Sequence, residues 1–408
     1  MSERSDHRPG LVVIGSGPAG VTAARSYLAA RGPGPVVVLT ADGHPPYQRP
    51  PLSKTVLAGE EPPEGTPIHE EEDALDGVEI RLATAVTSID TVRQVVRTDD
   101  GTELVYGQLV VASGSEPSRL PGADDGAAVL LLRSLEHAQG LDAALRGAGS
   151  ALVVGSGFIG CEAAASLSRR GLRVTLVTPE EAPQAARLGR WAGEQIAGWL
   201  RGAGVDLRTG VEVDRVEAPS QVHLDDGSVL EPELVLAAVG VEQARPFLES
   251  SGLSLEEGHL VVDVHLRTND AHVWAAGDVA RARHAVVDRS LSVEHWGDAL
   301  AMGEVAGHNA ADAALGREPA EAWETPPGFW SEIGEHTLKY SAWGDGYETE
   351  QVVEHGDGAF TVWYADAEDE LVGVLTHECD DDYELAADLL ARRTDLATAL
   401  RESREARR

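Results

Sequence analysis

Cysteine is nearly absent from this chain of 408 residues, which contains only Cys161 and Cys379. Two cysteines cannot build a disulfide framework, and these two match neither a CxxC pair nor the Cys and His spacing of a zinc site. We therefore expect no structural metal and no metal ligands at the functional site. Chemistry that depends on a close pair of cysteines is excluded as well.

Positive charge is also scarce. The chain has 33 basic residues against 68 acidic ones, a net charge of -35, and only Lys54 and Lys339 among the basic residues are lysine. This charge repels a phosphate backbone and anionic lipid, so we expect no nucleic-acid binding and no membrane association. Solubility explains the acidity most simply, and steering of a partner with a cationic patch is the alternative.

Long apolar runs are missing. No stretch of 18 uninterrupted apolar residues occurs, and the opening MSERSDHRPG mixes charges and does not lead into an apolar signal core. We therefore expect a cytoplasmic protein. The hydrophobic content of 42% supports a globular fold, and 408 residues exceed one ordinary hydrophobic core, so two or three domains are expected.

Two segments repeat one pattern of apolar strand, glycine turn and alanine-rich helix. They are LVVIGSGPAGVTAARSYLAARG from Leu11 and ALVVGSGFIGCEAAASLSRRG from Ala151. A second apolar strand follows each segment and ends at Thr40 or Thr178, which completes a parallel strand-helix-strand unit. The sequence therefore predicts an α/β fold with two Rossmann-like nucleotide-binding domains, each with a hairpin around a DDG turn.

The composition and the residue pattern of the sequence change from about Trp323 onwards. FWSEIGEHTLKYSAWGDGYE is rich in aromatic residues, FTVWYA and LVGVLTH alternate around the polar turn DAEDE, and DDDYELAADLLARR has a helical pattern. We expect a small α+β domain here. The terminal RTDLATALRESREARR is expected to fray or to extend the last helix.

Glycine turns between a strand and a helix are needed where a pyrophosphate binds, because side chains would block the backbone N–H groups and the helix N-terminus. The two GxGxxG motifs consist of Gly15, Gly17 and Gly20 and of Gly155, Gly157 and Gly160. A single motif is also compatible with a simple tight turn. Two copies in full strand-turn-helix context predict two dinucleotide sites.

An acid about 20 residues after such a motif often binds a ribose. Asp42 has this place in the first unit, with an ordinary turn aspartate as the alternative. In the second unit Thr178 ends the strand, and Glu180 and Glu181 follow, either as ribose ligands or as solvated loop charges. Because the first arginine nearby is Arg187, we expect NADH, and NADPH remains an alternative.

The segment YQRPPLSK, which ends at Lys54, resembles the signature of the FAD-dependent ferredoxin and rubredoxin reductases. Further motifs follow in the order of that family: VVASGSEPSRLPG from Val110, VWAAGDVA from Val273, VEHWGDALAMG from Val293 and GFWSEIG from Gly328. Together they span nearly the whole chain. The resemblance implies an FAD-binding domain of residues 1–118 and 242–322, an NAD(P)H-binding domain of residues 119–241, and a C-terminal α+β domain of residues 323–408.

Lys54 is the residue that the resemblance singles out for catalysis. Lysine is rare in this chain, and a compact ammonium near flavin N5 and C4=O would stabilise the negative charge of reduced flavin. In the family the matching lysine pairs with a glutamate two residues past the second glycine motif, which here is Glu162. Because burying an ion pair costs desolvation, we interpret this pair as functional, with a structural role as the alternative.

The resemblance also implies the other cofactor contacts. Asp278 would bind the ribitol of FAD, and we expect it also to cap the N-terminus of a helix. Trp330 would lie against the isoalloxazine, with an aromatic core residue as the alternative. The remaining expected FAD contacts are Gly15, Gly17, Pro18, Ala19, Gly20, Asp42, Arg49, Ala112, Gly114, Glu294, His295 and Trp296, and the expected NAD(P)H contacts are Gly155, Gly157, Phe158, Ile159, Gly160 and Glu180.

Because the chain lacks a close pair of cysteines, we expect the electrons to leave from the flavin itself. Disulfide reductases of this kind carry a CxxxxC pair early in the first domain, and related peroxide-linked and coenzyme-A-linked enzymes carry one cysteine where this chain has RPPLSK. Cys161 follows Gly160 in the second nucleotide-binding helix, where a small apolar residue belongs, so we expect it to be structural. The expected function is hydride transfer from NAD(P)H to flavin N5 and electron transfer to an external acceptor, a ferredoxin-type iron–sulfur protein.

Two other functions stay open. An NAD(P)H oxidase or diaphorase would use oxygen, a quinone or another small acceptor, and Ile333 stands where oxygenase-linked reductases would have a glutamine. A binding protein similar to apoptosis-inducing factor is a weaker alternative, because the net charge opposes nucleic acid. An arginine patch at Arg281 and Arg283 would help an acidic ferredoxin to dock. A monomer and a homodimer are both compatible with the sequence.

Overall fold

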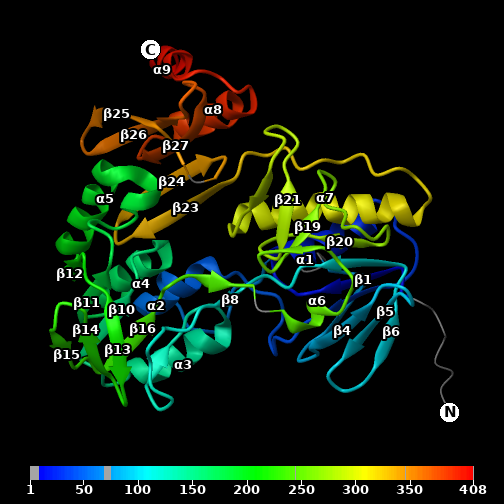
Figure 1. Ribbon diagram of the computed structural model, residues 1–408, viewed down its shortest axis with the longest axis horizontal. Helices are drawn as coiled ribbons and strands as arrows, with labels where there is room; N and C mark the ends of the chain where they lie inside the picture. Colours follow the sequence, from blue (N-terminus) through cyan, green and yellow to red (C-terminus); the bar gives the residue numbers. More distant parts are fainter. Residues whose placement is uncertain (1–8, 69–74, 244, 345, 408) are drawn as a thin grey trace. The chain divides into compact units, whose positions relative to one another are not determined.

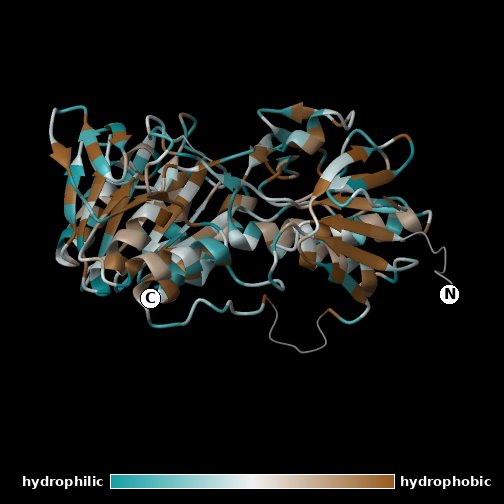
Figure 2. Cartoon of the chain, turned by 90° about the horizontal axis from the view of Figure 1, so that it is seen from below, coloured by the Kyte–Doolittle hydropathy of each residue, from teal (hydrophilic) through white to brown (hydrophobic). Residues whose placement is uncertain are grey.

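The computed structural model describes residues 9–68, 75–243, 245–344 and 346–407. The chain forms two compact units, each assembled from three segments. Unit 1 comprises Met1–Gln48, Thr66–Ser115 and Gln243–Gly328, and unit 2 comprises Arg49–Gly65, Glu116–Glu242 and Phe329–Arg408. Figure 1 shows the elements of both units, and Figure 2 shows that their strands are largely hydrophobic while the connecting loops are more polar.

Unit 1 is built on a five-stranded parallel sheet in the order β20-β7-β1-β2-β3. The strands are β1 (Leu11–Ile14), β2 (Val36–Leu39), β3 (Val78–Arg81), β7 (Gln108–Val111) and β20 (Val273–Ala275). Their residues are almost all apolar, and β1, β2, β7 and β20 are buried along their full lengths, as expected for a parallel sheet covered on both faces. Helices α1 (Pro18–Ala29) and α7 (Trp296–Ala314) pack against each other in this unit.

Two glycines bring α7 unusually close to α1. A Cβ atom on Gly303 would lie 2.4 Å from the backbone oxygen of Ala19, and one on Gly307 would lie 2.3 Å from that of Ala23. Such distances leave no room for a methyl group, so the two helices touch through their backbones. This contact lies directly behind the first turn of α1.

Smaller elements complete unit 1. An antiparallel sheet is made of β4 (Val86–Asp90), β5 (Val95–Thr98) and β6 (Glu103–Val105), with the DDG turn between its last two strands. A second small sheet is made of β18 (Leu255–Glu256), β19 (His259–Val262), β21 (Ala280–Arg283) and β22 (Ser290–Ser292), and α6 spans Pro246–Glu249. Because β21 is a strand, Asp278 does not cap a helix there, and the expectation of a helix N-cap is wrong.

Unit 2 repeats the plan of unit 1. Its parallel sheet has the order β12-β11-β10-β16-β9, and its strands are β9 (Val129–Leu130), β10 (Ser150–Val154), β11 (Arg173–Thr178), β12 (Asp206–Thr209) and β16 (Leu234–Ala237). The appended antiparallel sheet is made of β13 (Val213–Glu217), β14 (Gln221–Leu224) and β15 (Val229–Leu230). Its helices are α3 (Leu135–Leu145), α4 (Phe158–Arg169) and α5 (Ala185–Gly202). The repeat seen in the sequence is therefore a repeat of structure.

The C-terminal part of unit 2 is a five-stranded sheet in the order β23-β24-β27-β26-β25, followed by two helices. Its elements are β23 (Gly328–Ile333), β24 (His336–Ala342), β25 (Thr349–Gly356), β26 (Ala359–Ala365), β27 (Leu371–His377), α8 (Asp380–Ala391) and α9 (Leu396–Ala406). This sheet shares a hydrophobic core with α4 and α5, and the ring of Trp199 stacks on that of His336 with centroids 4.5 Å apart. The remaining elements of unit 2 are η1 (Pro50–Ser53), α2 (Thr55–Ala58), β8 (Glu116–Pro117) and β17 (Val241–Glu242).

Two details differ from the sequence expectations. The last segment neither frays nor extends α8, because Arg393 adopts a left-handed conformation (φ 53°) and the side chain of Asp395 accepts a hydrogen bond from the Thr398 N–H to start α9. Residues 323–328, expected in the C-terminal domain, fall in unit 1, where Trp323 packs against the ring of His284 at 4.6 Å.

Candidate functional site

The first glycine turn connects β1 to α1. Gly15 has φ +107°, and a Cβ there would lie 2.2 Å from the Ala112 oxygen, while a Cβ on Gly20 would lie 2.0 Å from the Gly15 oxygen. Both positions therefore require glycine. Gly17 precedes the helix and Pro18 occupies its first turn, where a missing N–H costs nothing.

The second glycine turn connects β10 to α4 in the same way. Gly155 has φ +101°, with a Cβ position 2.4 Å from the Ala238 oxygen, and a Cβ on Gly160 would lie 2.1 Å from the Gly155 oxygen. Gly157 precedes α4, Phe158 begins it, and Ile159 is 47% exposed at its N-terminus. Two turns in different units thus have the same geometry.

Among the described residues, the N-termini of α1 and α4 have no side-chain cap, a property that they share with α5, α7 and α8. By contrast, Ser134 caps α3 and Asp395 caps α9. Uncapped N-termini leave backbone N–H groups and the positive end of the helix dipole for an anion. With the tight glycine turns, this arrangement fits the pyrophosphate of a dinucleotide in each unit.

A serine–threonine pair fixes each turn, and sequence reasoning missed it. The Ser16 hydroxyl donates to Thr40 Oγ1 at 3.0 Å, and the hydroxyls of Ser156 and Thr178 lie 2.7 Å apart. Each pair ties the glycine turn to the end of the next strand. The signal was present in the sequence, because GSG and a strand-terminal threonine occur at the same places in both repeats. Gln184, also missed, donates from Nε2 to the Ser156 backbone oxygen at 3.1 Å.

The two expected ribose acids take equivalent positions. Thr40 Oγ1 accepts the backbone N–H of Asp42 at 3.2 Å, and Thr178 Oγ1 accepts that of Glu180 at 3.3 Å. Burial favours the neutral form of Asp42, but hydrogen bonds from the His44 backbone N–H and the Tyr47 hydroxyl hold its pKa below the usual value. Asp42 is thus part of a turn as well as a candidate ligand.

The expected ribitol ligand Asp278 lies after β20 and is 7% exposed. Its Oδ2 accepts the Ser115 hydroxyl at 2.6 Å, and its backbone oxygen accepts Gln243 Nε2 at 2.9 Å. Nearby in this network, buried Ser113 Oγ and Gln243 Oε1 have no hydrogen-bond partner within the described part of the chain. Buried polar atoms without partners are costly, so this region fits a polar ligand such as FAD. Gly114, with φ +65°, lies in the same loop.

The start of α7 holds the next group of expected FAD contacts. Glu294 is exposed, and His295 and Trp296 are partly buried. The carboxylate of Asp298, 3% exposed, accepts from Gly328 N–H at 3.1 Å and lies 3.1 Å from His295 Nδ1. Asp298 was missed by sequence reasoning, and it fixes the ring of His295.

Lys54 and Glu162 come together in unit 2. Lys54 Nζ lies 3.0 Å from Glu162 Oε2, and their side chains are 11% and 2% exposed. Glu162 Oε2 also accepts the Ser53 hydroxyl at 2.6 Å, and Oε1 accepts the Ser331 hydroxyl at 2.7 Å. The ion pair expected from the resemblance is present in the structure, whereas the serines were not foreseen.

The other expected contacts in unit 2 are less buried. Arg49 is partly buried just before η1, and Trp330 on β23 is 41% exposed. Its exposure rules out the alternative that Trp330 is a core residue. Its neighbour Phe329 instead packs on Phe158, with ring centroids 4.5 Å apart. Contact of Arg49 and Trp330 with a flavin stays a prediction.

Comparison with known proteins shows the family. Residues 9–303 match the family described as pyridine nucleotide-disulphide oxidoreductase. Putidaredoxin reductase from Pseudomonas putida is 31% identical over 373 residues, which cover 87% of this chain and 85% of that protein. The ferredoxin–NAD(+) reductase component of the biphenyl dioxygenase system from Paraburkholderia xenovorans is 30% identical over 351 residues, covering 85% and 84%. The chain belongs to the pyridine nucleotide-disulphide oxidoreductases.

Comparison with solved structures indicates the same kind of protein. The putidaredoxin reductase–putidaredoxin covalent complex gives a TM-score of 0.87 at 28% identity and covers 97% of this chain and 98% of that one. The expectations of a mixed α/β fold, of an NAD(P)H-dependent oxidoreductase and of FAD and NAD(H) as cofactors are confirmed at the level of this family.

This pyridine nucleotide-disulphide oxidoreductase has no disulfide in the described part of the chain. Cys161 is fully buried, its Sγ lies 3.3 Å from the Ser156 backbone oxygen, and burial raises the pKa of its thiol. A buried thiol with a raised pKa is a poor nucleophile. Cys379 is also a free thiol, and burial raises its pKa too. The burial of Cys161 agrees with the structural role expected for it.

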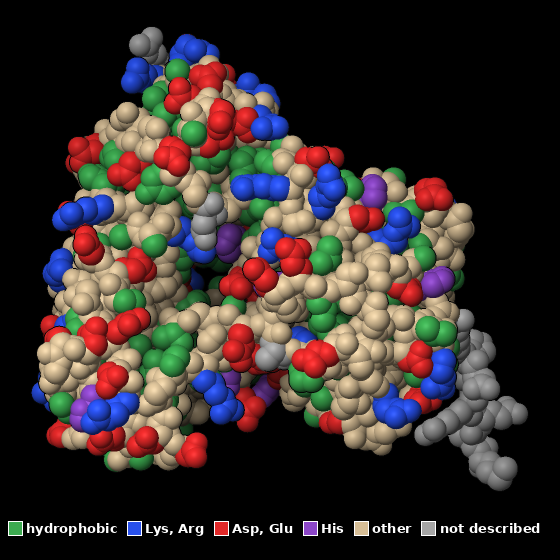
Figure 3. Space-filling view, viewed as in Figure 1, with side chains coloured by type: hydrophobic (Ala, Val, Ile, Leu, Met, Phe, Trp, Pro, Cys, Tyr) green, Lys and Arg blue, Asp and Glu red, His purple; other side chains and the backbone are tan. Residues whose placement is uncertain are grey.

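The arginine patch considered from the sequence is neutralised. Arg281 pairs with Glu256 and Glu257 at 3.2 and 3.3 Å, and Arg283 pairs with Asp288 at 2.6 Å. Figure 3 shows acidic and basic side chains interspersed over the visible face. Arg281 and Arg283 therefore do not offset the negative charge of the chain.

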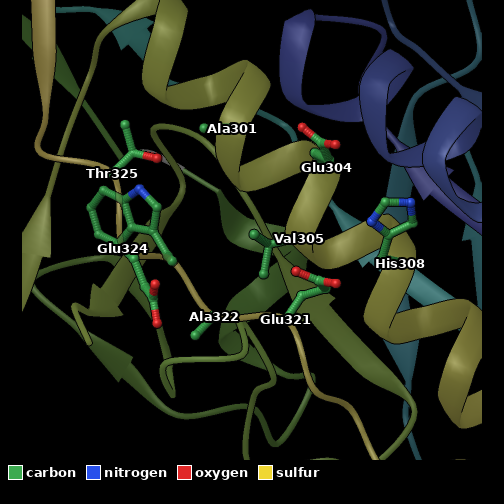
Figure 4. A pocket seen from close by; sticks show the side chains of 9 residues that line it. Ala301, Glu304, Val305, His308, Glu321, Ala322, Glu324 and Thr325 are labelled. Atoms are coloured by element: carbon green, nitrogen blue, oxygen red, sulfur yellow. The ribbon is translucent and has the colours of Figure 1, made fainter. Parts of the chain in front are cut away.

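A cavity of about 310 Å³ lies in unit 1 between α7 and residues 321–325. Figure 4 shows its lining, which includes Glu304 and His308 on α7 and Glu321 and Glu324 on the facing segment. None of the expected cofactor residues lines it.

None of the described helices is long and apolar enough to cross a membrane.

Proposed function

We propose that this chain takes electrons from NADH onto a bound FAD and passes them to an external iron–sulfur protein of the ferredoxin type. Bound FAD supplies the redox chemistry, because it accepts two electrons from NADH and can release them one at a time. The observation that carries the proposal is the buried Lys54–Glu162 pair in a chain whose cysteines are unsuited to redox exchange. The iron–sulfur partner is inferred from the relatives named above.

FAD would bind in unit 1. The uncapped N-terminus of α1 and the turn of Gly15, Gly17 and Gly20 would hold its pyrophosphate, and Asp42 its adenosine ribose. Asp278 would accept hydrogen bonds from the ribitol, and the partnerless Ser113 and Gln243 atoms would gain partners. The backbone at Ala112 and Gly114 and the start of α7 at Glu294, His295 and Trp296 would complete the site.

NADH would bind at the second turn, in unit 2. The N-terminus of α4, with Phe158 and Ile159, would face the pyrophosphate, and Glu180 would bind the adenosine ribose. A carboxylate at that position repels a 2′-phosphate, so NADH is favoured over NADPH. We also propose a division into an FAD-binding, an NAD(P)H-binding and a C-terminal domain, with the last one beginning after residue 328 because residues 323–328 fall in unit 1.

Lys54 is proposed as the catalytic residue. Its ammonium would stabilise the negative charge of the reduced flavin, and Glu162 would hold that ammonium in place. The side chains of Ser53 and Ser331 leave Glu162 saturated with donors, so its charge is compensated within the protein. Arg49 and Trp330 are proposed as further flavin contacts.

An anaerobic titration tests the proposal. The purified yellow protein is titrated with NADH and with NADPH and is then mixed with a panel of oxidised ferredoxins, with dissolved oxygen as a separate acceptor. We expect NADH to bleach the flavin absorbance and a ferredoxin to restore it faster than oxygen does. The Cys161→Ala/Cys379→Ala variant should behave like the parent. Absence of bleaching, or loss of reoxidation in that variant, contradicts the proposal.

A further inference from the structure

The carboxylate of Glu162 on α4 has four donors, which come from two segments of unit 2, residues 53–54 and 331–332. Its Oε2 accepts from Ser53 Oγ at 2.6 Å and from Lys54 Nζ at 3.0 Å. Its Oε1 accepts from Ser331 Oγ at 2.7 Å and from the Glu332 backbone N–H at 3.3 Å. Lys54 therefore meets a carboxylate whose two oxygens each accept a hydrogen bond from a serine.

The serines are as buried as the carboxylate. Ser53 is 3% exposed and Ser331 is 0% exposed, against 2% for Glu162. A buried carboxylate without enough donors pays a large desolvation cost, and hydrogen bonds to a charged acceptor are stronger than those between neutral groups. The two short hydroxyl contacts thus keep the carboxylate charged and fix its orientation for Lys54.

Ser53 is itself held from two sides by one helix. Glu162 and Ser166 lie one turn apart on α4, and while Glu162 accepts the Ser53 hydroxyl, the Ser166 hydroxyl donates to the Ser53 backbone oxygen at 2.9 Å. This double contact fixes the residue that directly precedes Lys54. Both the side chain and the backbone of the residue before Lys54 are therefore tied to α4.

We propose that Ser331 and Ser53 are positioning residues for Lys54, which act by locking the Glu162 carboxylate that holds its ammonium. Ser331 contributes from β23, so the C-terminal sheet takes part in setting the position of Lys54. Without the Ser331 hydroxyl, Oε1 would keep only the longer contact to the Glu332 N–H, and the carboxylate would turn more freely. The expected effect on catalysis rests on the proposed function, whereas the positioning of Lys54 through Glu162 does not.

The lysine content of the chain makes a direct test feasible. Lys54 and Lys339 are the only lysines, and Lys339 lies in the same unit, paired with Asp380 at 2.6 Å. The side chain of Lys54 is 11% exposed, and it lines a small cavity of about 30 Å³ together with Ser166. Trace acylation of the holoprotein at fixed pH, read by peptide mass spectrometry, gives the labelling of Lys54 relative to Lys339 as an internal reference.

Ser403 offers a matched control. Its hydroxyl donates to the buried carboxylate of Asp382 at 2.8 Å in the same unit, so Ser403→Ala removes the same kind of bond from another carboxylate. We expect Ser331→Ala and Ser53→Ala to raise the relative labelling of Lys54 about 3- to 10-fold and Ser403→Ala to leave it unchanged, in line with a lost hydrogen bond to a charged group. An unchanged or lowered ratio in both Ser331→Ala and Ser53→Ala overturns the proposal, as does an equal rise in Ser403→Ala.

A second readout separates this inference from the proposed function. Stopped-flow reduction by NADH should show a lower limiting rate in Ser331→Ala with an unchanged dissociation constant for NADH, because Ser331 positions Lys54 and does not bind the coenzyme. If Lys54→Met reduces its flavin as fast as the parent, the catalytic role of Lys54 fails, whereas the positioning of Lys54 is still decided by the labelling ratio alone. The two Ser→Ala variants are independent, so one that does not fold leaves the other to decide.

Discussion

Lys54 and Glu162 are 108 positions apart in the sequence, yet Nζ and Oε2 lie 3.0 Å from each other in an almost fully buried ion pair. Removing one partner of such a pair leaves a buried charge without compensation, at a cost of about 3–5 kcal/mol. Replacing both partners with apolar groups is often close to neutral. The pair therefore allows stability and catalysis to be separated.

Lys54→Met should retain FAD, lose stability by about 3–5 kcal/mol and slow flavin reduction by NADH roughly 100-fold, since one group that stabilises charge is lost. The double variant Lys54→Met/Glu162→Met should regain most of the stability but not the rate. Thermal unfolding and stopped-flow absorbance measure the two effects. Recovery of the rate together with the stability would mean that the pair is only structural.

Gly160→Ala should weaken NADH binding at least about 10-fold while FAD is retained. The new Cβ would lie 2.1 Å from the Gly155 backbone oxygen, so α4 must move away from its turn. Gly20→Ala should instead weaken the binding of FAD, because its Cβ would lie 2.0 Å from the Gly15 oxygen. Gly198→Ala on α5, where nothing lies within 4 Å, is the control and should be neutral or slightly stabilising.

Removal of FAD by Gly160→Ala, or of NADH binding alone by Gly20→Ala, would reverse the assignment of the two turns. Isothermal titration with NADH and the flavin content of the purified variants measure both quantities.

Glu180→Ala should improve the use of NADPH relative to NADH about 10-fold, which corresponds to about 1.4 kcal/mol. The change removes a negative charge from the place where a 2′-phosphate would lie. It also removes a hydrogen bond that the carboxylate accepts from the Ala186 N–H at 2.9 Å, so a small loss of stability is expected. The matched control is the exposed neighbour, in Glu181→Ala.

The ratio of kcat/KM values for the two coenzymes measures this preference. An equal effect of the Glu181 change would show that general charge, and not the ribose position, sets the preference.

His284 should make the protein less stable as the pH falls from about 6.5 to 5. Burial lowers the pKa of this fully buried imidazole below its usual value of 6.5, although the hydrogen bond to the Thr325 backbone oxygen opposes the shift. The folded state thus binds fewer protons than the unfolded state in this range, so stability is complete above pH 6.5 and declines below it. Asp42, whose pKa is lowered from 3.8, loses its contribution only in more acidic solution.

The midpoint of thermal unfolding, measured between pH 7.5 and 5, tests this expectation. His284→Gln should give a shallower decline, because a group that cannot be protonated replaces the imidazole. His336, whose pKa burial also lowers, should account for part of the decline that remains. An unchanged slope in His284→Gln would show that His284 does not cause it.

Regular patterns made much of the fold predictable from the sequence. Two copies of one strand-turn-helix pattern indicated two parallel sheets, because apolar periodicity and glycine turns are local signals. The Lys54–Glu162 pair came from a motif resemblance. The serines around Glu162 could not be predicted, since Ser331 meets Glu162 only through the packing of a strand 169 positions away.

Two expectations about secondary structure were wrong, one after Asp278 and one at the end of α8. A short segment after Asp278 reads as either helix or strand, and pairing with β19 makes it a strand. The left-handed residue Arg393 and the cap at Asp395 separate two helices that the apolar pattern joined. Tertiary contacts and single left-handed residues decided these cases.

The close contact between α1 and α7 has a consequence for evolution. Gly303 and Gly307 lie against backbone atoms, so every larger residue there would displace α1 by about the width of a methyl group. The N-terminal end of α1, where we propose that the FAD pyrophosphate binds, would move with it. Two positions far along the chain from the GxGxxG motif are therefore under the same constraint as the motif, and substitution at 303 or 307 should be tolerated only together with a compensating change on α1.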